Sequence, residues 1–311
     1  MMFTEHEQKI CLNMIVKNEA HVIERCLLSV KPFISSWAIL DTGSTDNTPE
    51  LVRRALAGVP GALGMGAWEG FATSRNRALD LALQSGSDYI LFLDADAIFH
   101  AGAFWNPDLD SDALLVEHRF GPFVYYKPSI VRASLPWRWK SPIHEYLHLE
   151  GDFSRRKLEG CYIQEQHEGA RSKDPDTHAK DAALLESMDQ DDPRVVFYLA
   201  QSYADSQQWD KALMTYLRRS EMGGWAEERY FASLQVARIL QAKEAPAEIV
   251  IRAYLLAYES RPTRSEPLGY LADYLAPSMP HVGRLLADAA KSKPLPSDLM
   301  YLEPKFYKEN K

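Results

Sequence analysis

The stretch Asp88-Tyr-Ile-Leu-Phe-Leu-Asp94-Ala-Asp96 decides the fold of this chain of 311 residues. An apolar run bounded on both sides by aspartate is typical of a short strand that is buried on both faces. If the chain stays extended to Asp96, Asp94 and Asp96 point to the same face. Hard divalent cations such as Mg²⁺ or Mn²⁺ prefer such oxygen ligands. An Asp-x-Asp pair is also common as a solvated turn, so the pair alone does not assign chemistry.

The residues before this strand alternate apolar runs with helical patterns. Strands are predicted at residues 11–16, 38–40 and 62–68, and helices at residues 19–30, 49–57 and 71–83. This alternation favours a parallel sheet with helices on both faces. Ligands of such sheets bind beyond the carboxyl ends of the strands, and polar residues follow the predicted strands at 17–19, 41–46 and 94–96.

The pattern changes after residue 113. Aromatic-rich segments at 113–120, 123–132 and 136–150 predict antiparallel strands and active-site loops that complete a first domain, residues 1–170. The polar stretch 169–177 is a predicted boundary. Residues 171–311 are almost entirely helical in pattern, with a weak repeat of about 34 residues that is typical of tetratricopeptide (TPR) helix pairs. An arbitrary helical bundle is the alternative.

Composition limits the classes of function. Acidic residues outnumber basic ones by 43 to 35, and the formal net charge of −8 argues against a general affinity for nucleic acid without excluding a local basic groove. The three separated cysteines form neither a disulfide framework nor a CxxC metal site, which favours a reducing compartment. The N-terminus is unlike a signal peptide, and no apolar run is long enough to span a bilayer. A cytoplasmic enzyme is the expectation.

The segment Asp41-Thr-Gly-Ser-Thr-Asp46-Asn-Thr lies between a predicted strand and a predicted helix. Gly43 permits a tight turn and a close approach of the backbone to a ligand, and the helix offers unpaired N–H groups. Asp41 can hydrogen-bond a base or a ribose. Asp46 either contacts the ligand or caps the helix.

Four motifs occur in this order in the chain: MIVKNE at 14–19, LDTGSTDNT at 40–48, SRNRAL at 74–79 and LFLDAD at 91–96. Together they resemble the family 2 glycosyltransferases of the GT-A fold. The segments PIHEYL at 142–147, HEGARS at 167–172 and FYLAQSY at 197–203 look like the bacterial subgroup that appends TPR-like helices, which includes the sublancin-type S-glycosyltransferases. The resemblance implies a Rossmann-like mixed sheet with helices on both faces, followed by an all-α TPR-like domain.

The resemblance also implies a nucleotide-sugar donor, usually a UDP-sugar, and inversion at the anomeric carbon. The residues implied at the nucleotide are Val16, Asn18, Glu19, Asp41, Arg75 and the segment Asp94-Ala95-Asp96, whose two acids would hold Mn²⁺ or Mg²⁺ with the diphosphate. Many family members have a second acid where this chain has Thr42, so the base must be read differently here if that acid normally contacts uracil.

The transfer needs a cation for the leaving diphosphate and a general base for an acceptor hydroxyl. Glu145 is the predicted base, and His144 orients the acceptor or substitutes for Glu145. His167 is a candidate third metal ligand, although a lone histidine is more often structural. The helical domain is expected to bind a peptide or protein acceptor or to form a homodimer.

Several alternatives remain open at the level of sequence. A catalytically silent TPR scaffold has no need of Asp94, Asp96, Arg75 and Glu145 together, and a nucleotidyltransferase needs a glycine-rich basic loop that the N-terminus lacks. A peptide cysteine or serine, a glycan, a lipopolysaccharide core sugar and a modified nucleobase all stay possible as acceptors.

Overall fold

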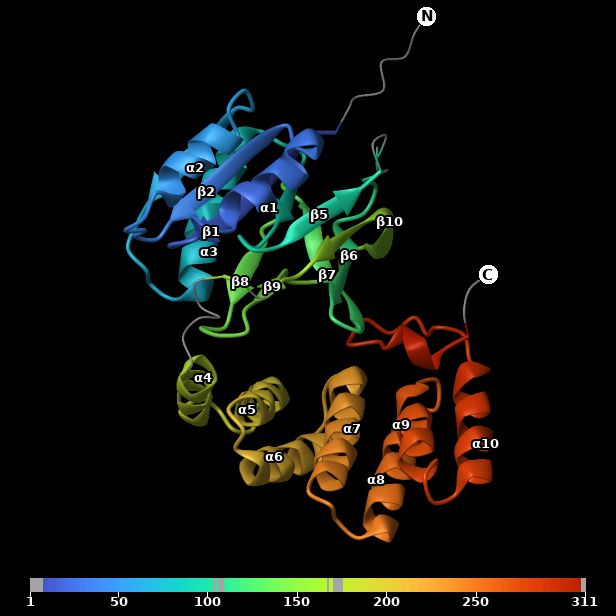
Figure 1. Ribbon diagram of the computed structural model, residues 1–311. Helices are drawn as coiled ribbons and strands as arrows, with labels where there is room; N and C mark the ends of the chain where they lie inside the picture. Colours follow the sequence, from blue (N-terminus) through green and yellow to red (C-terminus); the bar gives the residue numbers. More distant parts are fainter. Residues whose placement is uncertain (1–7, 103–104, 106–108, 167, 170–175, 309–311) are drawn as a thin grey trace, which may run out of the picture. The chain divides into compact units, whose positions relative to one another are not determined.

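The computed structural model describes residues 8–102, 105, 109–166, 168–169 and 176–308. The chain divides into two compact units. Unit 1 comprises Met1–Phe120 and Tyr126–Asp174, and unit 2 comprises Gly121–Tyr125 and Pro175–Lys311. The first unit is α/β and the second is mainly helical, which confirms the predicted fold class (Figure 1).

Unit 1 is built on a mixed sheet of eight strands in the order β3-β2-β1-β4-β7-β6-β10-β5. The strands are β1 (Ile10–Val16), β2 (Ser36–Asp41), β3 (Gly61–Met65), β4 (Tyr89–Phe92), β5 (Ile98–Ala101), β6 (Ala113–Phe120), β7 (Phe123–Arg132) and β10 (Arg155–Gln164). β1 pairs in parallel with β2 and β4, and β2 pairs in parallel with β3. The parallel sheet predicted for the first hundred residues is therefore confirmed.

The second half of the sheet is only partly antiparallel. β7 is antiparallel to β4 and β5 is antiparallel to β10, but β10 runs parallel to β6. The antiparallel pairing expected for the segments after residue 113 is therefore wrong for β10. The reason is the strand order, because β10 lies beside β6 on the side away from β7 and, like β6, runs opposite to β7. The connection between β7 and β10 contains a separate antiparallel hairpin, β8 (Arg138–Lys140) and β9 (Tyr146–His148).

Helices cover both faces of the parallel strands, because alternate strand residues point to opposite faces. Leu12 and Leu91 belong to the core cluster formed with α1 (Ile23–Val30) and α2 (Thr48–Ala55). Ile90 belongs to the cluster on the other face, formed with α3 (Phe71–Ala82). Short 3₁₀ turns, η1 (Lys31–Phe33) and η2 (Leu83–Ser85), follow α1 and α3.

Unit 2 is an array of consecutive helices, visible side by side in Figure 1. They are α4 (Thr177–Glu186), α5 (Pro193–Asp205), α6 (Trp209–Glu221), α7 (Ala226–Ala242), α8 (Ala247–Ser260), α9 (Glu266–Leu275) and α10 (Pro280–Lys291), followed by the 3₁₀ turn η4 (Pro304–Phe306). Small residues at buried positions, such as Ala212 and Ala237, allow neighbouring helices to approach closely. Within the described residues, no helix combines the length and apolar character needed to cross a membrane.

A buried ionic cluster holds the C-terminal segment of unit 2. The Arg264 side chain is 1% exposed and pairs with Glu266 at 2.9 Å and with Asp298 at 3.3 Å. The same guanidinium donates to the backbone oxygens of Met300 and Tyr301. The segment is therefore fixed to the helices by charge-assisted hydrogen bonds.

Candidate functional site

The loops after β1 and β2 are tied together at the carboxyl ends of these strands. The Asn18 side chain accepts a hydrogen bond from the Thr45 backbone N–H at 2.7 Å, and the Asn18 N–H donates to Ser44 Oγ at 2.9 Å. The Glu19 N–H donates to Thr48 Oγ1 at 2.9 Å. Val16 is buried and ends β1. The structure therefore brings these three predicted residues next to the predicted 41–48 segment.

Asp46 strengthens the same junction. Its carboxylate accepts hydrogen bonds from both the N–H and the hydroxyl of Thr48, at 3.0 and 2.6 Å, and from the Ala20 N–H at 3.2 Å. Asp46 thus accepts a hydrogen bond from an N–H at the start of α2 and also joins the two loops. These contacts give Asp46 a structural role that needs no ligand.

Asp41 is fully buried at the end of β2. Its Oδ1 accepts hydrogen bonds from the N–H groups of Gly43 and Ser44, at 2.8 and 2.7 Å. Gly43 has φ +102°, a backbone conformation that favours glycine. Asp41 Oδ2 has no hydrogen-bond partner among the described residues. Because a buried carboxylate oxygen without a partner is costly, this atom indicates a place for a ligand donor or a water.

The Asp94-Ala95-Asp96 segment is a turn and not a strand end. β4 ends at Phe92, and the Ala97 N–H donates to the Asp94 backbone oxygen at 3.1 Å. The argument that extended geometry places both acids on one face is therefore wrong. Ala95 is buried, Asp94 is half exposed, and Asp96 Oδ2 accepts the N–H groups of Glu168 and Gly169 at 2.8 and 2.9 Å.

Arg75 of α3 connects Asp94 to the predicted base. Its Nη2 donates to Asp94 Oδ1 and its Nε donates to Glu145 Oε1, both at 2.7 Å. The Arg75 and Glu145 side chains are each 13% exposed, whereas that of Asp94 is 48% exposed. Burial alone would raise the pKa of Asp94, but the cations of Arg75 and Lys127 outweigh it and hold that pKa below its usual value. Arg75 is therefore the centre of a charged cluster at the end of β4.

The β8–β9 hairpin positions Glu145 within reach of Arg75. The loop between the two strands carries His144, which has φ +49°, and Glu145. Asn76, the residue after Arg75, exchanges two hydrogen bonds of 2.9 Å with the backbone of Trp139 in β8. The Arg75 guanidinium lies 5.0 Å from the centre of the Trp139 ring. One turn of α3 therefore positions both the Arg75 guanidinium and the β8–β9 hairpin that carries Glu145.

Sequence reasoning missed a polar group on neighbouring strands. Lys127 of β7 pairs with Glu165, just after β10, at 3.3 Å. Glu165 also contacts His118 Nδ1 of β6 at 2.8 Å, and His118 Nε2 contacts Ser129 Oγ at 2.8 Å. No local motif marks these residues, because only the order of the strands in the sheet brings them together.

Asp94 and Asp96 supply oxygen donors of the kind that divalent cations prefer. The hydrogen bonds above use Oδ1 of Asp94 and Oδ2 of Asp96, so one oxygen of each carboxylate carries no hydrogen bond to a described residue. Mg²⁺ is commonly held by one or two carboxylates together with substrate phosphates and water. Within the described residues, no three His, Cys, Asp or Glu side chains form a metal-binding group. His167, the candidate third ligand, lies outside the described residues.

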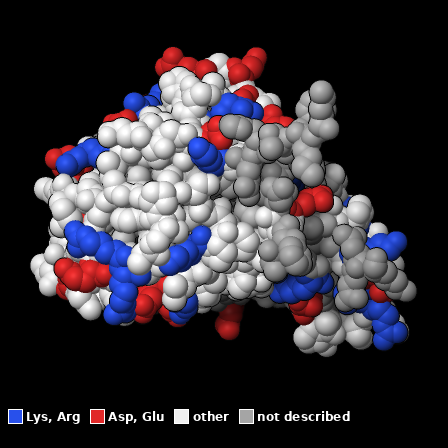
Figure 2. All heavy atoms as spheres, turned by 90° about the horizontal axis from the view of Figure 1, so that it is seen from above, with Lys and Arg blue, Asp and Glu red and all other residues white. Residues whose placement is uncertain are grey.

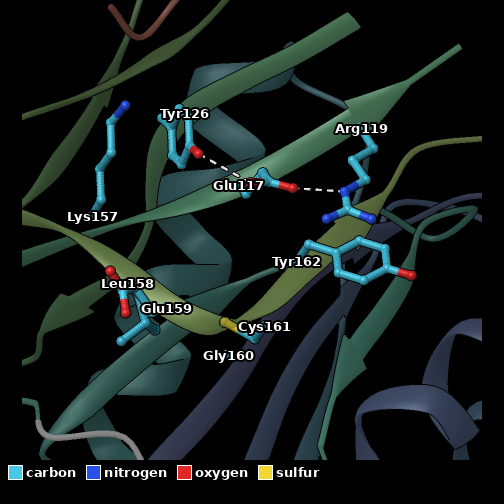
Figure 3. A pocket seen from close by; sticks show the side chains of 9 residues that line it. All are labelled: Glu117, Arg119, Tyr126, Lys157, Leu158, Glu159, Gly160, Cys161 and Tyr162. Atoms are coloured by element: carbon cyan, nitrogen blue, oxygen red, sulfur yellow. Dashed lines mark hydrogen bonds and ion pairs between the residues drawn. The ribbon is translucent and has the colours of Figure 1, made fainter. Parts of the chain in front are cut away.

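A hollow of about 320 Å³ lies elsewhere on unit 1, over β6, β7 and β10 (Figure 3). Glu117 accepts hydrogen bonds from Tyr126 and Arg119 inside it, and the Arg119 guanidinium lies 3.7 Å from the centre of the Tyr162 ring. The basic side chains of this hollow already contact aromatic rings or a carboxylate. None of the predicted site residues lines the hollow. The Arg75 cluster, and not this hollow, is therefore the candidate active site.

Residues 11–106 match the family described as Glycosyl transferase family 2. The matched segment contains β1 to β4 and both acids of the 94–96 turn. The mixed sheet and the helices on its two faces give the α/β unit a GT-A-like fold, in agreement with the match over residues 11–106.

Similar proteins were found by sequence and by structure. The chain is 34% identical over 146 residues to a TPR repeat-containing protein of Synechococcus elongatus. This alignment covers 44% of this chain and 35% of the relative. The match thus spans about a third of the relative's length. Crystal structures of S. aureus TarS 1-349, alone and in complex with UDP, have TM-scores of 0.39 and 0.35 at 16% and 17% identity. Each alignment covers 82% of this chain and 87% of the TarS chain.

Proposed function

We propose that unit 1 is a glycosyltransferase that moves a sugar from a UDP-sugar to an acceptor, with inversion at the anomeric carbon. The observation that carries the proposal is the cluster of Arg75 with Asp94 and Glu145 at the carboxyl end of the parallel strand β4. Arg75 and Asp94 lie within the matched residues 11–106, and Glu145 lies outside them. Parallel sheets bind ligands at this edge. The cluster also combines the acidic and basic groups that glycosyl transfer requires.

The donor is proposed to bind along the ends of β1, β2 and β4. Val16, Asn18 and Glu19 would line the nucleoside pocket, and Asp41 Oδ2 would accept a hydrogen bond from the base or the ribose. Thr42 donates its hydroxyl to the Val16 backbone oxygen at 3.2 Å, so it is already engaged in the protein. We therefore assign recognition of the base to Asp41.

The diphosphate is proposed to lie at Arg75 and the 94–96 turn. Asp94 and Asp96 would hold Mn²⁺ or Mg²⁺, which neutralises charge that develops on the leaving diphosphate. Arg75 contributes a permanent positive charge at the same place. Its pKa is raised because Asp94 and Glu145 outweigh the effect of burial, so Arg75 remains protonated at all relevant pH values.

Glu145 is the proposed general base. Its Oε1 is bound to Arg75, which leaves Oε2 to take a proton from the acceptor. In a single displacement the acceptor oxygen bonds to the anomeric carbon, its proton passes to Glu145, and the diphosphate leaves with the electrons of the broken C–O bond. His144, the adjacent residue in the hairpin loop, is proposed to orient the acceptor.

The test is release of UDP from UDP-glucose, UDP-galactose and UDP-N-acetylglucosamine, measured with Mn²⁺, with Mg²⁺ and with EDTA. Asp96→Ala and Asp94→Ala are expected to lose turnover and to keep the cooperative thermal unfolding of the wild type. Asp152→Ala removes an exposed carboxylate of unit 1 and serves as the matched control. A double Asp94/Asp96 variant with near-normal turnover would remove the metal from the proposal. UDP binding without turnover of any donor would indicate a silent scaffold instead.

Unit 2 is proposed to bind a peptide, protein or glycan acceptor or to form a homodimer. Several apolar side chains are exposed on its helices, including Met214 (66%), Leu256 (57%) and Leu285 (69%). Replacing Leu256 and Leu285 by serine is expected to lower transfer to the acceptor while leaving UDP-sugar hydrolysis unchanged. Light scattering on the same variants separates loss of a dimer from loss of acceptor binding. An equal fall in hydrolysis would refute this division of labour.

Lys and Arg side chains are interspersed with Asp and Glu on the face shown in Figure 2. A phosphate backbone is bound mainly by clustered positive charge. The mixed charges of the described part of this face therefore argue against a phosphate-backbone site there.

A further inference from the structure

A row of charged and polar groups continues from the Asp94 turn across three neighbouring strands. In the sheet, β4 is followed by β7, β6 and β10. Asp94 follows β4, Lys127 lies on β7, His118 lies on β6, and Glu165 follows β10. The row is thus created by the order of the strands, and only its first member belongs to the site predicted from sequence.

The members of the row are linked by an ion pair and by hydrogen bonds. Glu165 Oε1 lies 3.3 Å from Lys127 Nζ and 2.8 Å from His118 Nδ1, and His118 Nε2 lies 2.8 Å from Ser129 Oγ. The His118 side chain is 3% exposed, and burial together with the Lys127 charge lowers its pKa to about 4. His118 is therefore neutral near pH 7 and adds no positive charge. The Lys127 side chain is 44% exposed, so part of it is open to solvent.

Lys127 acts electrostatically on the same space as Arg75. Burial lowers the pKa of Lys127, but attraction to Glu165 and Asp94 outweighs burial and the repulsion from Arg75. Lys127 therefore remains charged. β7 pairs antiparallel with β4 and places Ile130 opposite Leu91, so the same register continued brings Lys127 opposite the position of Asp94, which Arg75 of α3 binds. Positive charges gathered at one place attract an anion to it.

We propose that Lys127 is a second cationic contact, beside Arg75, for the diphosphate of the nucleotide-sugar donor. The proposal rests on the proposed function of unit 1. The Arg75 guanidinium is bound by two carboxylates at 2.7 Å, and the ion pair of Lys127 with Glu165 is longer, at 3.3 Å. The compact ammonium of lysine on a flexible stem can turn toward a phosphate oxygen when the donor arrives.

The experiment compares the binding of UDP with the binding of uridine by calorimetry, because the difference between the two isolates the diphosphate. Lys127→Met is expected to raise the Kd of UDP about tenfold, which is the lower end for a charge-assisted contact, and to leave the Kd of uridine unchanged. Lys127→Arg keeps the charge and is expected to bind UDP as the wild type does. Lys9→Met is the matched control, because Lys9 is exposed just before β1 at the opposite edge of the sheet.

A second measurement uses the unaltered protein and does not depend on the folding of a variant. Acetylation of wild-type lysines is followed by mass spectrometry, and UDP is expected to slow the acetylation of Lys127 severalfold, whereas uridine does not. Lys9 is expected to react at the same rate in all samples. Equal UDP affinity of the wild type and Lys127→Met, or no protection of Lys127 by UDP, overturns the inference alone. A wild type that binds neither UDP nor uridine overturns the proposed function as well.

Discussion

Arg75→Met is the most informative perturbation of the site, because it removes one cation and leaves two carboxylates behind. The methionine keeps the length and apolar stem of the side chain but cannot donate a hydrogen bond. Glu145, with 13% of its side chain exposed, loses its partner at 2.7 Å and stays largely buried. Asp94, with 48% exposed, regains solvation from water.

The magnitude follows from these two exposures. Leaving a mostly buried carboxylate without its charged partner costs about 2 kcal/mol of unfolding free energy. The half-exposed pair with Asp94 adds only about 0.5 kcal/mol, because solvent screens it. The sum, about 2.5 kcal/mol, corresponds to a decrease of roughly 5–10 °C in the melting temperature of a domain of this size.

The assay is urea and thermal unfolding of the wild type, Arg75→Met, Glu145→Gln and the double variant. If the pairing carries the stability, Glu145→Gln costs about 2 kcal/mol less in the Arg75→Met background than in the wild type. Arg53→Met removes an exposed arginine from α2 and is expected to change stability by less than about 0.5 kcal/mol. Additive effects of the two site substitutions, or wild-type stability of Arg75→Met, would refute the reasoning.

Three further predictions concern single residues. His118 stays neutral in the folded protein down to about pH 4, whereas an unfolded histidine binds a proton below about 6.5. The unfolding free energy is therefore expected to fall by up to roughly 3 kcal/mol as the pH drops from 6.5 toward 4, and His118→Gln should flatten this slope in urea titrations. Glu145→Gln is expected to slow transfer to a hydroxyl by roughly 10²–10⁴-fold with UDP affinity nearly unchanged, and a wild-type rate in a coupled UDP-release assay would place the base elsewhere. Arg264→Met is expected to destabilise unit 2 by about 3–5 kcal/mol and to expose the C-terminal segment to limited proteolysis, and equal protease resistance would contradict the role of the buried cluster.

The parallel half of the sheet could be predicted from sequence because its information is local. Each apolar run ends at or just before a polar residue, and the chain between the runs has helical periodicity. The predicted strand at 88–93 differs from β4 by only one residue at each end. The convergence of the strand ends then follows from topology, which is why Asn18, Asp41 and Asp94 could be expected at the same edge of the sheet.

The remaining features depend on turns and on long-range pairing. The predicted helix at 19–30 begins only at Ile23, because the N–H groups of Val22 and Ile23 both bind the Glu19 backbone oxygen in a turn. The turn after β4 likewise replaces the extended geometry assumed for Asp94 and Asp96. Lys127 and Glu165 could not be linked from sequence, because the placement of β10 beside β6 has no local signal.

The charges that the fold assembles explain why a cation belongs to the proposed reaction. Four carboxylates, those of Asp94, Asp96, Glu145 and Glu165, accompany two cations, Arg75 and Lys127, while His118 is neutral. This excess of negative charge opposes the approach of a diphosphate, and one divalent cation cancels it. Removal of the Lys127 charge enlarges the excess, so UDP binding by Lys127→Met should depend more steeply on Mn²⁺ than UDP binding by the wild type. The same dependence in both proteins would mean that Lys127 and the cation act on different parts of the ligand.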